Sequence, residues 1–172
     1  VYFVNDVAFD PTDPAKVWVC AGNKYLPVAR SINGGETWQS ARTGLPEGAV
    51  GYSISIDAVN PNNMYAAMSG QNGVYKTNNF ALYWLRRNEG LGSSDVRVVR
   101  SAPGAPEVVY AGTYGHGVFR STNGADSWRA TGALPEGGAR AVWSLAIDPA
   151  SADRVWAGTS AGTAIARGSL PS

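Results

Sequence analysis

Short runs of alternating or continuous apolar residues, separated by turn residues, recur along the whole chain. "YSISID" (52–57) and "WSLAID" (143–148) alternate with a period close to two, whereas "VYAGT" (109–113) and "VWAGT" (155–159) are almost continuously apolar. The runs are rich in Val, Ile, Tyr, Trp and Thr and are bounded by Gly, Pro, Asn or Ser, which is typical of short β-strands. No segment sustains the 3.6-residue period of a helix, so the sequence predicts an all-β fold.

These runs repeat with a common period. The aromatic residue of the continuous run recurs at Trp18, Tyr65, Tyr110 and Trp156, with steps of 47, 45 and 46 residues. A second set of landmarks, Trp38, Trp84 and Trp128, recurs with steps of 46 and 44 residues. Independent landmarks that share one period indicate copies of a single structural unit.

Each unit contains four runs, which we name strands A to D in chain order: "YSISID", "VYAGT", "GVFRS" and "SWRATG" are examples. Four antiparallel strands in about 45 residues are the signature of a β-propeller blade. We expect a single domain over residues 1–172, with blades at about 1–48, 49–94 and 95–139 and an incomplete fourth blade at 140–172. The chain would then hold about 3.75 blades, fewer than most propellers need to close.

Three arrangements could accommodate the incomplete fourth blade. The chain could be a segment of a larger propeller, or two copies could complete one ring. Alternatively, a four-bladed ring could close if residues 1–5 supplied the missing outer strand. The first arrangement is favoured because an open propeller edge is prone to unwanted pairing.

Two similar nonapeptides lie 90 residues apart. "RSINGGETW" (30–38) and "RSTNGADSW" (120–128) share Arg, Ser, Asn, Gly and Trp. An Asn-Gly pair between two strands predicts a hairpin, because both residues tolerate positive φ and the Asn side chain can bond to backbone N–H groups in the turn. We therefore assign these segments to the hairpin between strands C and D, with the Trp on strand D packing between blades. A third copy, "TNNFALYW" (77–84), has lost the glycine.

These three turns resemble the Asp-box, or BNR repeat, of sialidase-like propellers. The residues that carry the resemblance are Ser31, Asn33, Gly35, Trp38, Thr77, Asn79, Trp84, Ser121, Asn123 and Trp128. The resemblance implies that the turns lie at the blade periphery, away from a central site. Propellers of this kind include sialidases, xyloglucan-cleaving glucanases, sortilin-type receptors and photosystem assembly factors, so the resemblance identifies a fold rather than an activity.

Positions that recur with the period are expected to build the scaffold. Three recurring aspartates, Asp10, Asp57 and Asp148, are predicted to cap the turns between strands A and B. Four recurring basic residues, Arg30, Lys76, Arg120 and Arg167, are predicted to lie at blade edges.

Catalysis by a glycoside hydrolase requires two carboxylates that face each other across a cleft. In xyloglucan-cleaving relatives, the resemblance implies catalytic aspartates in blade loops at the central cleft. The four B–C loops of this chain, "GNKYLPV", "SGQNGV", "TYGHGV" and "TSAGTA", contain no Asp or Glu. The sequence assigns no catalytic residue, so it favours a non-catalytic protein and leaves the enzyme question open.

Binding residues are expected where the copies differ, and the B–C loops differ most. The candidates there are Tyr25, Gln71, Asn72, Tyr114 and His116. Aromatic faces beside amide donors suit a glycan or peptide ligand. If the B–C loops open at one end of the propeller, these side chains would share one surface.

Composition limits the remaining functions. A net charge of +1 with 16% charged residues argues against nucleic-acid binding, and no apolar run is long enough to insert into a membrane. One histidine and one cysteine are too few for a metal site, and no cofactor motif occurs, so no metal or cofactor is expected. Cys20 lies in an apolar run and is predicted to be buried and unreactive.

Two functional hypotheses remain. The leading one is a non-catalytic binding or assembly scaffold that presents loops to a glycan or protein partner. The alternative is a fragment of a secreted glycoside hydrolase, xyloglucanase- or sialidase-like, whose catalytic carboxylates lie mostly outside this chain. Either could also pair with further blades of the same protein or with a second copy. An extracellular or cell-surface location is expected, although no signal segment occurs in the sequence.

Overall fold

The computed structural model describes residues 3–132 and 141–167. Every regular element in these ranges is a β-strand, and they contain no helix that could span a membrane. The strands are β1 (Val4–Phe9), β2 (Val17–Ala21), β3 (Val28–Ser31), β4 (Gln39–Ser40), β5 (Gly51–Ile56), β6 (Met64–Met68), β7 (Gly73–Thr77), β8 (Leu85–Arg86), β9 (Val96–Ala102), β10 (Ala105–Thr113), β11 (Val118–Ser121), β12 (Arg129–Ala130), β13 (Val142–Asp148), β14 (Ser151–Thr159) and β15 (Gly162–Arg167).

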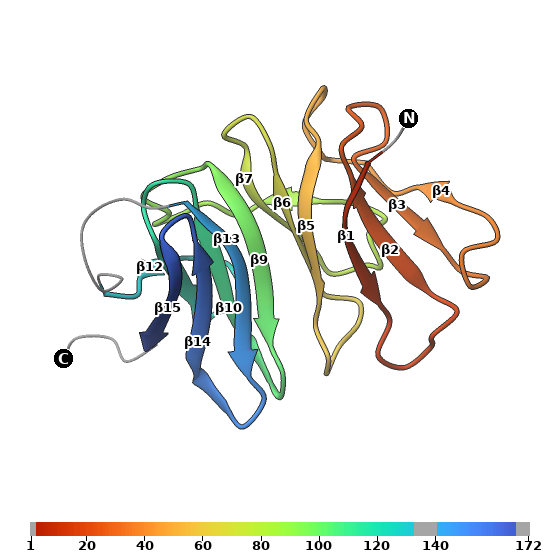
Figure 1. Ribbon diagram of the computed structural model, residues 1–172. Helices are drawn as coiled ribbons and strands as arrows, with labels where there is room; N and C mark the ends of the chain where they lie inside the picture. The colour runs from red at the N-terminus through yellow and green to blue at the C-terminus, as the bar shows by residue number, and fades with distance from the viewer. Residues whose placement is uncertain (1–2, 133–140, 168–172) are drawn as a thin grey trace.

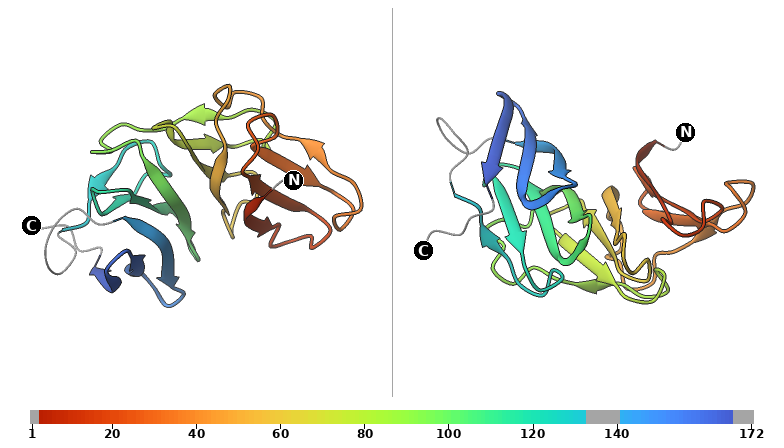
Figure 2. Two further views of the ribbon diagram at one scale, coloured as in Figure 1. Left: turned by 45° about the horizontal axis from the view of Figure 1, so that its top comes forward. Right: turned by 90° about the horizontal axis from the view of Figure 1, so that it is seen from below.

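The strands form four antiparallel sheets, which we call blades 1 to 4. Blades 1 to 3 contain β1–β4, β5–β8 and β9–β12, and blade 4 contains β13–β15. Within each blade, strands pair in chain order, so the first strand lies at one edge of its sheet. The blades follow one another along an open arc, with β1, β5, β9 and β13 on its inner side and blades 1 and 4 at its two ends (Figures 1 and 2). The all-β propeller fold, in a partial form, is confirmed.

The structure contradicts closure of a four-bladed ring by the N-terminal residues. β1 already begins at Val4 and pairs with β2, and the carbonyl of Phe3 accepts a hydrogen bond from the N–H of Gly22 at 2.7 Å. Residues 3–5 therefore belong to the inner strand of blade 1 and do not supply an outer strand for blade 4.

The hydrophobic core lies in the seams between consecutive blades. Trp18 of blade 1 packs in one cluster with Trp84 of blade 2, and Tyr65 of blade 2 packs in a second with Trp128 of blade 3. A third cluster joins blades 3 and 4 through Tyr110 and its neighbours. Each blade thus contributes one apolar face to each adjoining seam, and the propeller has a chain of small cores.

Cys20 lies in the first of these seams. It is fully buried, and its thiol contacts the carbonyl oxygen of Ser53 in blade 2 at 3.4 Å. Burial raises the pKa of the thiol well above its usual value, which keeps it protonated. The prediction that the cysteine is buried is confirmed.

The C–D turns are held by side-chain hydrogen bonds, as their sequence predicts. The hydroxyl of Ser31 accepts from the N–H of Gly35 at 2.9 Å, and the side-chain oxygen of Asn33 accepts from the N–H of Thr37 at 3.0 Å. Blade 3 repeats both bonds through Ser121 and Asn123, each at 2.9 Å. The nonapeptides are therefore turn structures, and their polar side chains are used within the turn.

The copy in blade 2 adopts the same turn without glycine. Phe80 and Ala81 have φ values of 58° and 60°, where the first copy has Gly34 and Gly35 at 71° and 92°. Positive φ is unfavourable for a residue with a side chain. The Phe80 ring stacks on Trp18 of blade 1 at a centroid distance of 6.2 Å, and this packing helps to offset the backbone strain.

Strand D is shorter than the sequence suggested. Runs of five or six residues such as "SWRATG" were expected, but β4, β8 and β12 have two residues each, and the Trp precedes the strand. In blades 2 and 3 the Trp bonds to the preceding blade instead of to strand C, and the strand is equally short in blade 1, where the Trp forms no such bond with any described residue. The N–H of Trp84 donates to Thr43 at 2.9 Å, and its indole Nε1 donates to Ala41 at 2.8 Å.

The recurring charged residues have the scaffold roles that were predicted. In Asp10, Asp57 and Asp148, one carboxylate oxygen accepts a hydrogen bond from the backbone N–H two residues further on, at 2.8–2.9 Å. Burial tends to raise the pKa of Asp10, but hydrogen bonds from Thr12 and the charge of Lys16 outweigh it and leave the pKa lowered.

The recurring basic residues reach across blade edges. Arg30 donates to the carbonyl of Phe80 in the next blade at 3.3 Å, and Lys76 lies 3.7 Å from Asp126 of the next blade. Arg120 likewise pairs with Asp153 of blade 4. The side chain of Arg167 and the second Leu-Pro-Glu-Gly loop (134–137) lie outside the described residues.

Candidate functional site

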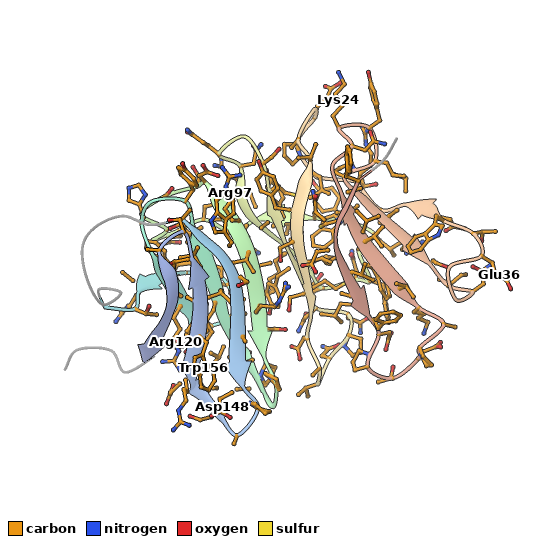
Figure 3. The ribbon with its side chains drawn as sticks, viewed as in Figure 1. Lys24, Glu36, Arg97, Arg120, Asp148 and Trp156 are labelled. Carbon is orange, nitrogen blue, oxygen red and sulfur yellow. The ribbon has the colours of Figure 1, made fainter. Side chains whose placement is uncertain are left out.

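The B–C loops of the four blades open at the same end of the propeller (Figure 1). Figure 3 shows Lys24, in the first of these loops, at that end together with Arg97, whereas Asp148 and Arg120 lie toward the opposite end. The B–C loops therefore lie at one end of the propeller, as expected. We call this end the loop face.

Three of the five predicted ligand residues line one pocket on the loop face. Gln71, Tyr114 and His116 surround an open pocket of about 730 Å³ between blades 2 and 3. The links that lead into β9 complete it, with Asn88 and Asp95 among the lining residues. The pocket is mainly polar, and it brings together amide, imidazole and phenol groups that are far apart in the sequence.

The other two predicted residues lie elsewhere. Tyr25 is in the B–C loop of blade 1 and is 71% exposed, with the ammonium of Lys24 at 5.0 Å from its ring centroid. The side-chain amide of Asn72 donates to the carbonyl of Ser69 in its own turn. Neither residue is among those that line the pocket.

A β-bulge occurs at the start of the inner strand in every blade. In blade 2, Gly51 pairs with Met68 but Ser53 pairs with Ala67, so one extra residue lies between them on β5. The same irregularity occurs near the start of β1, β9 and β13. A bulge locally bends a strand and re-aims the extra side chain, and bulges are common beside functional sites.

The extra residue of the bulge is different in each blade. The four residues are Asn5, Tyr52, Arg97 and Trp143, at steps of 47, 45 and 46 residues that match the repeat. The backbone feature is therefore part of the repeat, whereas the side chain it carries is not. Sequence reasoning missed this position because it looked for variation in loops only. The signal was present at the start of strand A, where the same register holds four unrelated side chains.

Three aromatic rings surround the Arg97 guanidinium. Its central carbon lies 4.7 Å from the ring centroid of Tyr52, 5.1 Å from that of Tyr114 and 5.5 Å from that of Trp143. Tyr114 and Trp143 also meet edge to face, with centroids 6.0 Å apart. These rings come from blades 2, 3 and 4, so the cluster joins three blades at the loop face. Tyr114 and Trp143 are 51% and 52% exposed, which leaves ring surface available to a ligand.

Asp95 neutralises the charge of this cluster. One carboxylate oxygen accepts a hydrogen bond from Nη2 of Arg97 at 3.0 Å, and the other lies 3.0 Å from Nε as an ion pair. The backbone N–H of Tyr114 donates to the carbonyl of Asp95 at 2.8 Å, which ties the acidic residue to the neighbouring loop. We call Tyr52, Asp95, Arg97, Tyr114 and Trp143 the mouth.

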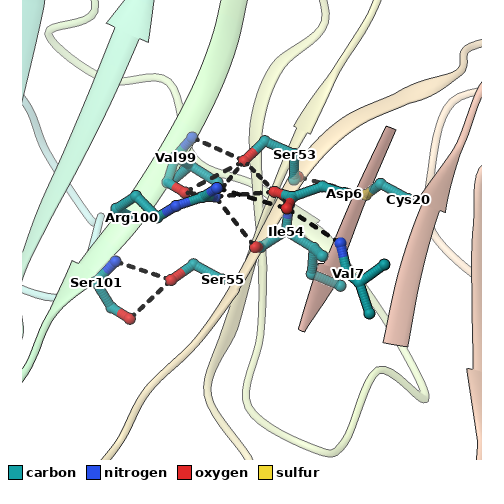
Figure 4. Close-up of polar contacts among 9 residues, drawn as sticks. All are labelled: Asp6, Val7, Cys20, Ser53, Ile54, Ser55, Val99, Arg100 and Ser101. Atoms are coloured by element: carbon teal, nitrogen blue, oxygen red, sulfur yellow. Dashed lines mark hydrogen bonds and ion pairs between the residues drawn. The ribbon is translucent and has the colours of Figure 1, made fainter. Parts of the chain in front are cut away.

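A second ion pair joins the inner strands of blades 1, 2 and 3 (Figure 4). The carboxylate of Asp6 on β1 accepts from Nη1 of Arg100 on β9 at 2.9 Å, from the hydroxyl of Ser53 at 2.8 Å and from the N–H of Ile54 at 2.9 Å. The guanidinium of Arg100 also donates to the carbonyl of Val99 at 2.9 Å. This network lies on the inner side of the arc and holds three blades together.

The arrangement at the loop face suits binding better than acid–base chemistry. Both carboxylates described above, Asp6 and Asp95, are paired with arginines of this chain. No group of three or more His, Cys, Asp or Glu side chains within the described ranges could hold a metal ion. Exposed aromatic faces beside a polar pocket are the features of a site for a hydroxyl-rich ligand.

No family model matches the chain. Among curated proteins, it is 28% identical over 172 residues to the xyloglucanase Xgh74A of Acetivibrio thermocellus, a match that covers 79% of this chain and 20% of the relative. The chain thus spans about a fifth of the length of the curated relatives it matches.

Solved structures show the same fold. An ancestral GH74 enzyme superimposes with a TM-score of 0.78 at 21% identity, over 97% of this chain and 23% of the other. The GH74 xyloglucanase of Xanthomonas campestris gives 0.70 at 24% identity, over 98% and 25%. YCF48 bound to a D1 peptide gives 0.67 at 17% identity, over 91% and 48%. The chain therefore shares the β-propeller fold of these structures.

Proposed function

We propose that this chain is a segment of a glycoside-degrading β-propeller protein and that its mouth binds an uncharged stretch of polysaccharide. The observation that carries the proposal is the set of aromatic side chains around Arg97, two of which come from the bulge position of the inner strands. The similarity to a xyloglucanase supports a glycan as the ligand.

The mouth and the adjoining pocket would contact different parts of a sugar. Sugar rings present apolar C–H faces that stack on aromatic side chains, and the exposed rings of Tyr114 and Trp143 offer such faces. Sugar hydroxyls need hydrogen-bond partners, and Gln71, Asn88 and His116 line the pocket beside Tyr114. One glycan segment could contact both surfaces.

The catalytic carboxylates of such an enzyme are proposed to lie outside this chain. Hydrolysis needs a proton donor and a second carboxylate, whereas Asp6 and Asp95 are each held by an arginine. This reading takes up the hydrolase alternative, which the xyloglucanase relatives favour over a purely non-catalytic scaffold.

A peptide-binding scaffold is the second candidate. It is favoured by one observation, the likeness of the fold to YCF48 in a complex with a D1 peptide. The mouth could receive a peptide through the same aromatic surface, so the ligand class must be decided by experiment.

Two finer features belong to the same proposal. The C–D turns are proposed to be Asp-boxes, and their hydrogen bonds through Ser31, Asn33, Ser121 and Asn123 support that assignment. An extracellular or cell-surface location is proposed because polysaccharide-degrading enzymes meet their substrates there.

The test is binding of neutral oligosaccharides by the chain and by two tryptophan variants. Trp143 and Trp38 are exposed to similar extents, 52% and 43%, but only Trp143 belongs to the mouth. Isothermal titration with xyloglucan oligosaccharides and cellohexaose should show binding that Trp143→Ala weakens about tenfold, since one stacked ring contributes roughly 1 kcal/mol or more. Trp38→Ala should leave the affinity unchanged.

The outcomes separate the candidates. Absence of binding to every neutral oligosaccharide, or an equal loss in both variants, would contradict a glycan site at the mouth. Binding of extended peptides that is sensitive to Trp143 would favour the scaffold. Turnover of xyloglucan by this chain, abolished by Asp6→Asn or Asp95→Asn, would show that the catalytic carboxylates lie within it.

A further inference from the structure

The Arg97 guanidinium occupies a position that a ligand cation could otherwise take. It lies within 5.5 Å of three ring centroids, and its side chain is only 22% exposed. Arginine stacks on aromatic faces through its planar guanidinium, so it fixes the rings from blades 2, 3 and 4 relative to one another. An unpaired guanidinium in this setting would make the mouth a binding site for anions.

Asp95 counters the binding of anions at Arg97. Both of its oxygens contact Arg97 at 3.0 Å, and its own position is fixed by a 3.2 Å hydrogen bond from its N–H to Ser93 and by the contact between its carbonyl and Tyr114. One edge of the guanidinium therefore already faces an acid of the protein itself. A carboxylate on a ligand would meet the negative charge of Asp95 as well as the positive charge of Arg97.

We propose that Asp95 is a specificity-determining residue, which cancels the charge of Arg97 and so restricts the mouth to uncharged sugars over uronic acids. The inference rests on the proposed function, because it assumes that the mouth receives a glycan. It goes further by naming the class of sugar that is rejected and the side chain that rejects it. The arginine keeps its role in placing the aromatic rings, and the acid decides which saccharides those rings accept.

The experiment compares two linear hexasaccharides, neutral cellohexaose and acidic hexagalacturonate, on the 172-residue chain. Asp95→Asn removes the negative charge and retains the shape of the side chain. This variant should bind hexagalacturonate at least about tenfold more tightly than the unmodified chain at low salt, with the gain reduced as salt rises. Its affinity for cellohexaose should fall only about threefold, since the rings remain in place.

The matched control is Asp153→Asn. It changes the net charge by the same amount and also removes the acid from an aspartate–arginine pair, that with Arg120, but away from the mouth. Affinity for hexagalacturonate should be unchanged in this variant. In the double variant Asp95→Asn/Arg97→Gln, the gain for the acidic sugar should disappear, because the uncovered cation is its source. Near-UV circular dichroism checks that each variant retains its packed aromatic side chains.

The possible failures are distinguishable. If the chain binds cellohexaose but Asp95→Asn gains no affinity for hexagalacturonate beyond that of Asp153→Asn, the role of Asp95 is wrong and the glycan site stands. If the chain binds no neutral sugar but Asp95→Asn binds the acidic one, the charge-cancelling role stands and the proposed ligand is wrong. If neither sugar binds any variant, both proposals are overturned.

Discussion

Blades 1 and 2 have equivalent apolar faces, but the face of blade 2 is buried and that of blade 1 is exposed. Ile54 and Trp84 of blade 2 are 2% and 1% exposed because blade 1 covers them. The equivalent residues of blade 1, Val7 and Trp38, are 47% and 43% exposed. The two faces differ little in residue type. Each blade therefore has a face that can pack against an adjacent blade, and the face is buried only where that blade is present. A face of this kind is consistent with a segment of a larger propeller.

The mouth shows the opposite relation between repeat and chemistry. There the backbone feature, a bulge, is the same in all four blades, whereas the side chains differ. Similar residues at equivalent positions build seams, and dissimilar residues at equivalent positions present a site. Changes in the seam should therefore affect stability, and changes in the mouth should affect binding.

The largest effect is expected from Trp84→Ala. The substitution removes a fully buried indole from the seam and leaves the carbonyl of Ala41 without its 2.8 Å hydrogen bond. Large-to-small changes of this kind cost about 3–5 kcal/mol of unfolding free energy. Urea denaturation followed by tryptophan fluorescence measures the loss.

Cys20 provides a local readout of the same change. Its thiol is buried in the seam that contains Trp84, so reaction with an aromatic disulfide reagent should be blocked in the unmodified chain and accelerated in Trp84→Ala. Trp128→Ala is the matched control, because it opens the next seam and should expose Cys20 much less. Equal acceleration in both variants would show that the seams do not open independently.

A smaller effect is expected from Asp6→Asn, which breaks the polar link between blades 1, 2 and 3. The change removes the charge that faces Arg100 and weakens the bonds from Ser53 and Ile54. Since Arg100 is about one third exposed and water can solvate it, the cost should be about 1–2 kcal/mol. Asp13→Asn, which breaks a pair with Lys16 whose acid is more exposed than Asp6, should cost less than about 1 kcal/mol in the same urea titration. Equal costs would contradict a structural role for the Asp6 network.

The fold was predictable because the same pattern of strands and turns occurs several times in the sequence. The steps between Trp18, Tyr65, Tyr110 and Trp156 give the period, and the Asn-Gly turns place the hairpins. The two-residue length of strand D was not predictable in this way. In blades 2 and 3 it accompanies bonds between the Trp and the preceding blade, which are contacts across the fold and leave no local signal, and the same length occurs in blade 1 without such bonds among the described residues.

The candidate site was predicted only in part. Tyr114 was found because it lies in a variable loop, and the pocket does bring it together with Gln71 and His116. Arg97 and Trp143 were missed because a bulge cannot be seen in a single strand. It exists only as a mismatch of register between two strands, and without it these side chains would be assigned to one face or the other of an ordinary strand.

A small stability effect is also expected from Trp38→Ala, which tests whether burial by a neighbouring blade is what makes this position stabilising. Trp38 occupies the same place in its turn as Trp84, but no described residue of a preceding blade covers it. Removing a side chain that is 43% exposed should cost about 1 kcal/mol, several times less than Trp84→Ala in the same urea titration. A cost as large as that of Trp84→Ala would mean that the Trp stabilises the turn itself. In that case the comparison between the covered and uncovered faces would no longer explain how the blades are held together.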